Sequence, residues 1–184
     1  MFASDVVGRA ISAFLLLVLV SFFQVSQADD RISIGIGDAN EDIDVFRIGL
    51  QRDFSKRWLR DRSWGLSGFW ELSVSRWDSV GDDDSINAVA FSPVFTCSPN
   101  RSTGFKPYIE GGIGVAFISD TELGARDFST GFQFEDRIGV GILFGRQQQH
   151  DLNFKFLHYS NADIEMPNDG IDIFMLSYGY AFSS

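Results

Sequence analysis

The feature that most constrains this chain is a regular alternation of apolar and polar residues that begins after residue 28. No stretch beyond that point is apolar for long enough to form a membrane-spanning helix. Apolar side chains instead recur at every second position, which in an extended strand places them all on one face. The clearest run has Trp64, Leu66, Trp70, Leu72 and Val74 on one face and Ser67, Glu71, Ser73 and Ser75 on the other. The pattern predicts strands with one apolar and one polar face.

We expect eight such strands, at residues 31–37, 45–54, 64–77, 86–97, 106–117, 131–144, 151–160 and 171–182. Strands of this number and length predict an all-β fold, an eight-stranded antiparallel β-barrel. A soluble barrel would also alternate, so the period alone does not identify a membrane protein. The aromatic content of the apolar faces, including Phe174, Tyr178, Tyr180 and Phe182 in the last strand, favours a transmembrane barrel of the outer membrane.

The first 28 residues have the pattern of a signal peptide. Arg9 supplies a positive charge, residues 10–23 form an apolar run, and Ser26 and Ala28 place small residues at the cleavage site. An N-terminal membrane anchor is the alternative, but the apolar run is short for a spanning helix. Cleavage after Ala28 would leave residues 29–184 as a single barrel domain.

The charge and the cysteine content exclude several classes of function. The net charge is −10, so the chain lacks the basic surface that nucleic-acid binding requires. Cys97 is the only cysteine, which excludes an intrachain disulfide and a cysteine-based metal cluster. Acidic residues gather in the predicted loops, where solvation is the simplest interpretation; a divalent cation shared with lipid phosphates is the alternative. We expect no cofactor, and the sequence leaves open whether the protein is a homodimer.

Residues suited to ester hydrolysis lie close together near the C-terminus. His158 and Ser160 are two apart, so in a strand they project from the same face with Cα atoms about 7 Å apart. Residues 167–170 (Pro-Asn-Asp-Gly) predict a turn into the next strand. If the hairpin is centred near Glu165, Asp172 lies opposite His158, with Cβ atoms about 5 Å apart. A nucleophile, a base and an orienting acid would then share one face.

The position of these residues in the alternation predicts which face they share. His158 and Ser160 are even-numbered like Phe154, so they point outward toward lipid, whereas Tyr159 points into the barrel. Asp172 shares the outward face of its own strand. A basic residue facing lipid costs about 2–4 kcal/mol at the membrane midplane and less near the interface, so such groups are rarely accidental. With both termini in the periplasm, this hairpin would lie at the outer leaflet, where lipopolysaccharide is.

The same residues resemble the PagL family of lipid A 3-O-deacylases. The resemblance is carried by His158, Tyr159, Ser160 and Asn161 in succession, followed by Pro-Asn-Asp-Gly-Ile at residues 167–171. It extends upstream through residues 91–95, 106–115 and 134–141. It implies an outer-membrane serine esterase that hydrolyses the ester-linked acyl chain at the 3-position of lipid A, with lipopolysaccharide as the substrate.

The resemblance also implies roles for single residues. His158 matches the catalytic histidine, Ser160 the nucleophile, and Asp172 the acid, where the family has glutamate. Asn161 and Asn168 match asparagines associated with oxyanion stabilisation or with support of the site, and the sequence does not divide these two roles between them. The alternatives are a non-enzymatic small outer-membrane barrel, such as an adhesin or stability protein, and a soluble lipocalin-like lipid carrier.

Overall fold

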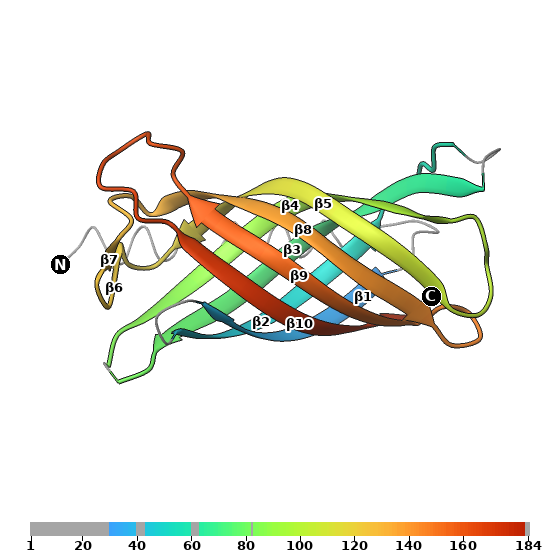
Figure 1. The fold of residues 1–184 in the computed structure, drawn as a ribbon, viewed down its shortest axis with the longest axis horizontal. Coiled ribbons are helices and arrows are strands. Elements are labelled where there is room, and N and C mark those ends of the chain that lie inside the picture. The colour runs from blue at the N-terminus through green and yellow to red at the C-terminus, as the bar shows by residue number, and fades with distance from the viewer. Residues whose placement is uncertain (1–29, 40–42, 60–62, 82, 183–184) are drawn as a thin grey trace.

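A computed structural model describes residues 30–39, 43–59, 63–81 and 83–182; the expected signal peptide lies outside these residues. The eight long strands are β1 (Asp30–Ala39), β2 (Ile43–Asp53), β3 (Trp64–Ser79), β4 (Ser85–Pro99), β5 (Lys106–Ile118), β8 (Phe132–Phe144), β9 (His150–Ser160) and β10 (Ile171–Phe182). They close into one barrel in the order β1-β10-β9-β8-β5-β4-β3-β2, with every neighbouring pair antiparallel (Figure 1). The predicted eight-stranded barrel is confirmed, and each predicted strand end lies within two residues of the observed one.

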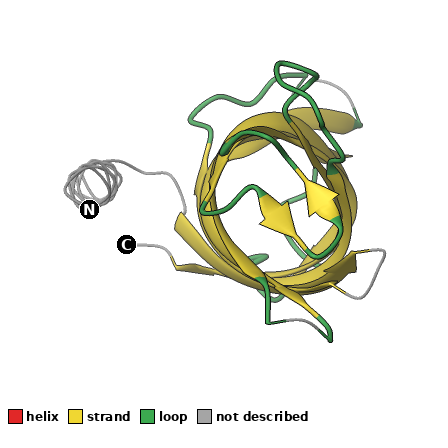
Figure 2. Cartoon of the chain, turned by 90° about the vertical axis from the view of Figure 1, so that its left-hand side faces the viewer, coloured by secondary structure: helices red, strands yellow, loops and turns green. Residues whose placement is uncertain are grey.

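Two further strands were not predicted. β6 (Glu122–Leu123) and β7 (Arg126–Asp127) pair as a small hairpin within the connection from β5 to β8. They are too short to show an alternating pattern, so the sequence gives no signal for them. Seen along the barrel axis, the hairpin lies across the mouth of the barrel (Figure 2). We call this end, which also carries the connection at residues 161–170, the loop end.

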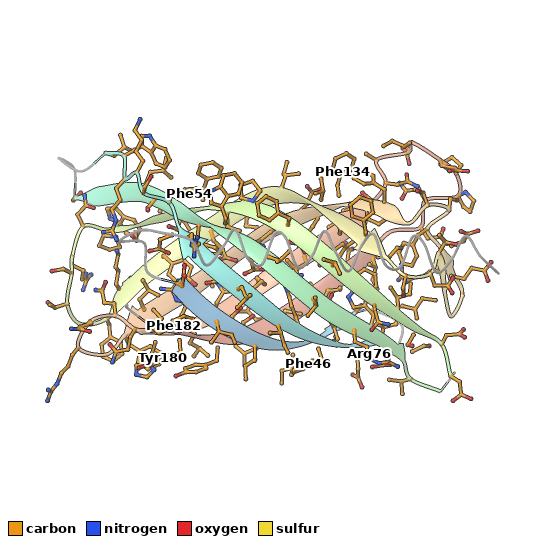
Figure 3. The ribbon with its side chains drawn as sticks, turned by 180° about the vertical axis from the view of Figure 1, so that it is seen from behind. Phe46, Phe54, Arg76, Phe134, Tyr180 and Phe182 are labelled. Atoms are coloured by element: carbon orange, nitrogen blue, oxygen red, sulfur yellow. The ribbon has the colours of Figure 1, made fainter. Side chains whose placement is uncertain are left out.

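The outer wall of the barrel is apolar along all of its long strands. Exposed side chains include Ile34, Ile48, Val74, Phe91, Ile113, Ile138, Phe154 and Leu176. Phe46 and Tyr180 project from the wall away from the barrel (Figure 3). A continuous apolar surface of this extent is suited to lipid rather than water. A lipocalin-like carrier would have its apolar face inward, so this alternative is wrong.

None of the described residues forms a helix long and apolar enough to cross a membrane.

The middle of the barrel interior is filled by paired charges. Arg47 donates to Glu71 and to Glu135, each at 2.8 Å. Arg137 donates to the same two carboxylates, at 2.6 Å and 2.8 Å. All four side chains are buried. Mutual pairing offsets the cost of removing these charges from water, and the interior is packed at this level.

Toward the loop end, the interior becomes apolar. This core contains Trp77, Ile86, Phe128, Leu157, Ile171 and Ile173. Tyr159 joins the two levels: its ring lies 4.8 Å from that of Trp77, and its hydroxyl donates to Glu135. The expected inward direction of Tyr159 is confirmed. Its contacts hold β9 from inside, directly behind His158 and Ser160.

Candidate active site

His158 and Asp172 form the pair that the sequence predicted. They are direct register partners on β9 and β10, and the Nδ1 atom of His158 lies 2.6 Å from Oδ1 of Asp172. A carboxylate can only accept, so in the neutral imidazole this contact favours the tautomer with the hydrogen on Nδ1, which leaves the Nε2 lone pair for use as a base. The side chains are 38% and 46% exposed on the outer wall. Aspartate therefore reaches the imidazole although it is shorter than glutamate.

Ser160 ends β9 on the same outward face and is partly exposed. In the part of the chain that the structure describes, no hydrogen bond joins Ser160 to His158; contacts of this kind often tighten only when substrate binds. Gly170 bounds the space beside both residues. A Cβ atom added to Gly170 would lie 3.3 Å from Cε1 of His158 and 3.7 Å from Cβ of Ser160. The φ angle of Gly170 is +60°, so both the backbone conformation and the close approach favour glycine.

The two asparagines of the neighbouring loop have different surroundings. Asn161 is fully buried, and its amide nitrogen donates to the carbonyl oxygens of Phe128 (3.1 Å) and Glu165 (2.8 Å). Both of its amide hydrogens are therefore engaged. Asn168 accepts a hydrogen bond from the backbone N–H of Asn161 and donates one amide hydrogen to Asp163 at 3.0 Å. Among the described residues, its second amide hydrogen has no acceptor. These contacts suit Asn161 to loop support and Asn168 to hydrogen-bond donation.

Asp136 is a polar neighbour that the sequence reasoning overlooked. It lies on β8, directly opposite His158 on the side away from Asp172. The row Asp136, His158, Asp172 thus crosses three adjacent strands of an otherwise apolar wall. The signal was present, because Asp136 is even-numbered like its outward neighbours Phe134 and Ile138.

An apolar groove of about 580 Å³ lies on the outer wall beside this row. Its lining includes Phe95, Ile109, Gly111, Ile138, Phe154 and Phe156. Gly111 is the register partner of both Phe95 and Ile138. Because Gly111 has no side chain, the space between those two side chains stays open. Phe156 precedes His158 by two residues on the same face, so this end of the groove lies next to the polar row, although none of the row's residues lines it. The arrangement can hold an alkyl chain next to a polar row.

The sequence is similar to known proteins over most of its length. The family model "Lipid A 3-O-deacylase (PagL)" matches residues 44–181. The lipid A deacylase PagL of Pseudomonas aeruginosa is 34% identical over 153 residues, covering 83% of this chain and 86% of that protein. The lipid A deacylase PagL of Bordetella bronchiseptica is 31% identical over 164 residues, covering 86% of each.

A solved structure shows the same fold. The crystal structure of the outer membrane enzyme PagL matches with a TM-score of 0.74 and 32% sequence identity. The match covers 82% of this chain and 98% of that one. Sequence and fold thus agree over most of the barrel, and the chain belongs to the lipid A 3-O-deacylase (PagL) family.

Proposed function

We propose that this outer-membrane barrel hydrolyses the ester-linked acyl chain at the 3-position of lipid A, with Ser160, His158 and Asp172 as a catalytic triad on the lipid-facing wall. The observation that carries the proposal is the hydrogen bond between His158 and Asp172 on the outer wall, with Ser160 on the same face. The names of the two bacterial relatives, both lipid A deacylases, support the choice of substrate.

The chemistry follows from the hydrogen bond between His158 and Asp172, which leaves Nε2 of the neutral ring free to act as the base. Its Nε2 atom takes the proton of the Ser160 hydroxyl as the oxygen attacks the ester carbonyl carbon. The resulting tetrahedral intermediate expels the sugar oxygen, which leaves as an alcohol after receiving that proton from His158. Water, activated by the same imidazole, then releases the fatty acid from Ser160. Asp172 holds the ring in the required tautomer and stabilises its charged form.

The tetrahedral intermediate carries a negative oxygen that requires hydrogen-bond donors. Among the described residues, one amide hydrogen of Asn168 has no acceptor and could serve as such a donor; backbone N–H groups of the loop at residues 161–170 are the other source. Loss of one such donor typically lowers kcat by about 10²–10³-fold. Asn161 supports this arrangement by fixing the loop that carries Asn168.

The position of the site fits a substrate that is itself a membrane lipid. The polar row lies near the loop end of the barrel, and the apolar groove runs beside it along the wall. We place the loop end at the outer leaflet, where lipid A is found. The ester would then meet Ser160 at the interface while the acyl chain occupies the groove, and no cofactor takes part in the scheme.

Mass spectrometry of lipid A from cells with and without the protein tests the proposal. Cells with the wild-type protein should lose one hydroxyacyl chain, and cells with Ser160→Ala or His158→Ala should not. Ser102→Ala, in an exposed turn, and His150→Ala, on β9 far from the site, are the matched controls and should behave as wild type. Unchanged lipid A with the wild-type protein would favour a non-enzymatic barrel.

A further inference from the structure

The connection from β5 to β8, residues 119–131, is anchored in the barrel interior. Leu123 and Phe128 of this connection are buried, and the Phe128 ring centre lies 6.2 Å from that of Trp77. The hairpin of β6 and β7 consequently lies across the mouth of the barrel (Figure 2). Its position is therefore fixed by the core and offers a support for neighbouring loops.

This connection is joined to the loop at residues 161–170 by a set of hydrogen bonds. They run from Arg126 Nη1 to Gly170 O (2.6 Å), from Asp127 N to Asp169 Oδ2 (2.8 Å), from Asp169 N to Asp127 O (3.2 Å), from Ser129 Oγ to Pro167 O, and from Asn161 Nδ2 to Phe128 O (3.1 Å). Both segments supply donors. Four of the five bonds involve Pro167, Asp169 or Gly170, and the fifth involves Asn161. The two loops form one hydrogen-bonded unit.

The hydrogen bond from Arg126 is made to Gly170, the loop residue next to His158 and Ser160. Gly170 lies beside the His158 ring and Ser160, because a Cβ added to it would come within 2.9 Å of the Tyr159 carbonyl oxygen and 3.3 Å of Cε1 of His158. It precedes Asp172 by two residues. Movement of the Gly170 carbonyl would therefore disturb both the space beside the nucleophile and the strand that presents the acid. Arg126 donates with a permanently charged group, which makes the hydrogen bond one of the stronger kinds.

We propose that Arg126 is a positioning residue. Its hydrogen bond fixes Gly170 beside His158, and the hairpin of β6 and β7 thereby keeps His158, Ser160 and Asp172 in their relative positions. This inference rests on the proposed function. Arg126 acts through the Gly170 backbone and does not bind the substrate. Its loss should therefore slow the chemical step and leave substrate binding unchanged.

Steady-state kinetics on purified protein with lipid A in detergent test this role. Arg126→Ala should lower kcat by about 10–100-fold, as expected when catalytic groups shift by up to about 1 Å, with KM unchanged. Arg126→Lys should recover part of kcat, because an ammonium group can still donate to the carbonyl. Arg146→Ala, in an exposed turn at the opposite end of the barrel, is the matched control and should equal wild type. A raised KM with normal kcat would overturn the proposal and assign Arg126 to substrate binding.

Hydrogen exchange separates this inference from the proposed function. Backbone amides of residues 161–172 should exchange faster in Arg126→Ala than in wild type or Arg146→Ala, a result that requires no activity. If wild type releases no acyl chain, the proposed function fails while the exchange measurement still tests the support of the loop. If Arg126→Ala does not fold, Arg126→Lys supplies the test. Wild-type exchange and wild-type kcat in a folded Arg126 variant would overturn the positioning role.

Discussion

His158 and Asp172 face each other on neighbouring strands of the lipid-facing wall, with Nδ1 and Oδ1 2.6 Å apart. Direct register pairing brings the two backbones close enough for the shorter acid to reach the ring. The loop of the same hairpin holds three other acids, Asp163, Glu165 and Asp169. Asp163 accepts a hydrogen bond from the Asn168 amide, and Asp169 accepts one from the backbone N–H of Asp127. Asp172 is thus the acid whose replacement tests the proposed triad most directly.

We expect Asp172→Asn to lose about 10⁴-fold in kcat, as a neutral amide cannot stabilise the imidazolium and favours the wrong tautomer. Asp172→Glu should keep substantial activity, because the loop before it can absorb one added methylene. Initial rates of fatty-acid release by the two purified variants give the comparison. Wild-type activity in Asp172→Asn would show that this acid does not orient His158.

Asn168→Ala should mainly lower kcat, whereas Asn161→Ala should mainly destabilise the loop at residues 161–170. Asn168→Ala should lower kcat by about 10²–10³-fold, if its available amide hydrogen is an oxyanion donor. Asn161→Ala removes one donor from the carbonyl oxygen of Phe128, which keeps the backbone N–H of Thr130, and one from that of Glu165. Each lost hydrogen bond should cost about 0.5–1.5 kcal/mol. Hydrogen exchange of residues 161–170 should therefore accelerate mainly in Asn161→Ala. Normal kcat in a folded Asn168→Ala variant would assign the donors to backbone N–H groups.

The sequence predicted those parts of the molecule that a period of two determines. Alternation located all eight long strands, the inward direction of Tyr159 and the pairing of His158 with Asp172. The same alternation places Asp136 on the outward face, but only the register of β8 with β9 brings it opposite His158.

The rest depends on contacts that leave no local pattern. Arg126 and Gly170 are 44 residues apart and meet because two loops fold over the same barrel mouth. The hairpin of β6 and β7 has two residues in each strand, too few for any periodicity. The difference between Asn161 and Asn168 is likewise a matter of which acceptors surround each amide in the folded loop.

Glu135→Ala tests the paired charges of the interior. The substitution removes a carboxylate that accepts hydrogen bonds from Arg47, Arg137 and Tyr159, and leaves two buried guanidinium groups sharing Glu71. Loss of one partner from a buried ion pair costs about 3–5 kcal/mol. Unfolding in urea, followed by the heat-modifiable mobility of the barrel on gels, should show a lower midpoint than wild type. Glu122→Ala, at an exposed position of β6, is the control; equal midpoints would mean that the interior pairs do not stabilise the barrel.

Gly111→Leu tests whether the groove on the outer wall holds the acyl chain. A Cβ atom at residue 111 would make only an ordinary contact, 3.6 Å from the Arg137 carbonyl oxygen, so the barrel can accept the side chain. The leucine would occupy part of the groove. Long acyl chains need more of the groove's length than short ones. Activity should therefore fall more for substrates with long 3-linked chains. Competition between lipid A species of different chain length, scored by mass spectrometry, gives the ratio directly. Ile48→Leu, on β2 away from the groove, should leave that ratio unchanged. The same chain-length ratio in Gly111→Leu and wild type would show that the acyl chain lies elsewhere on the wall.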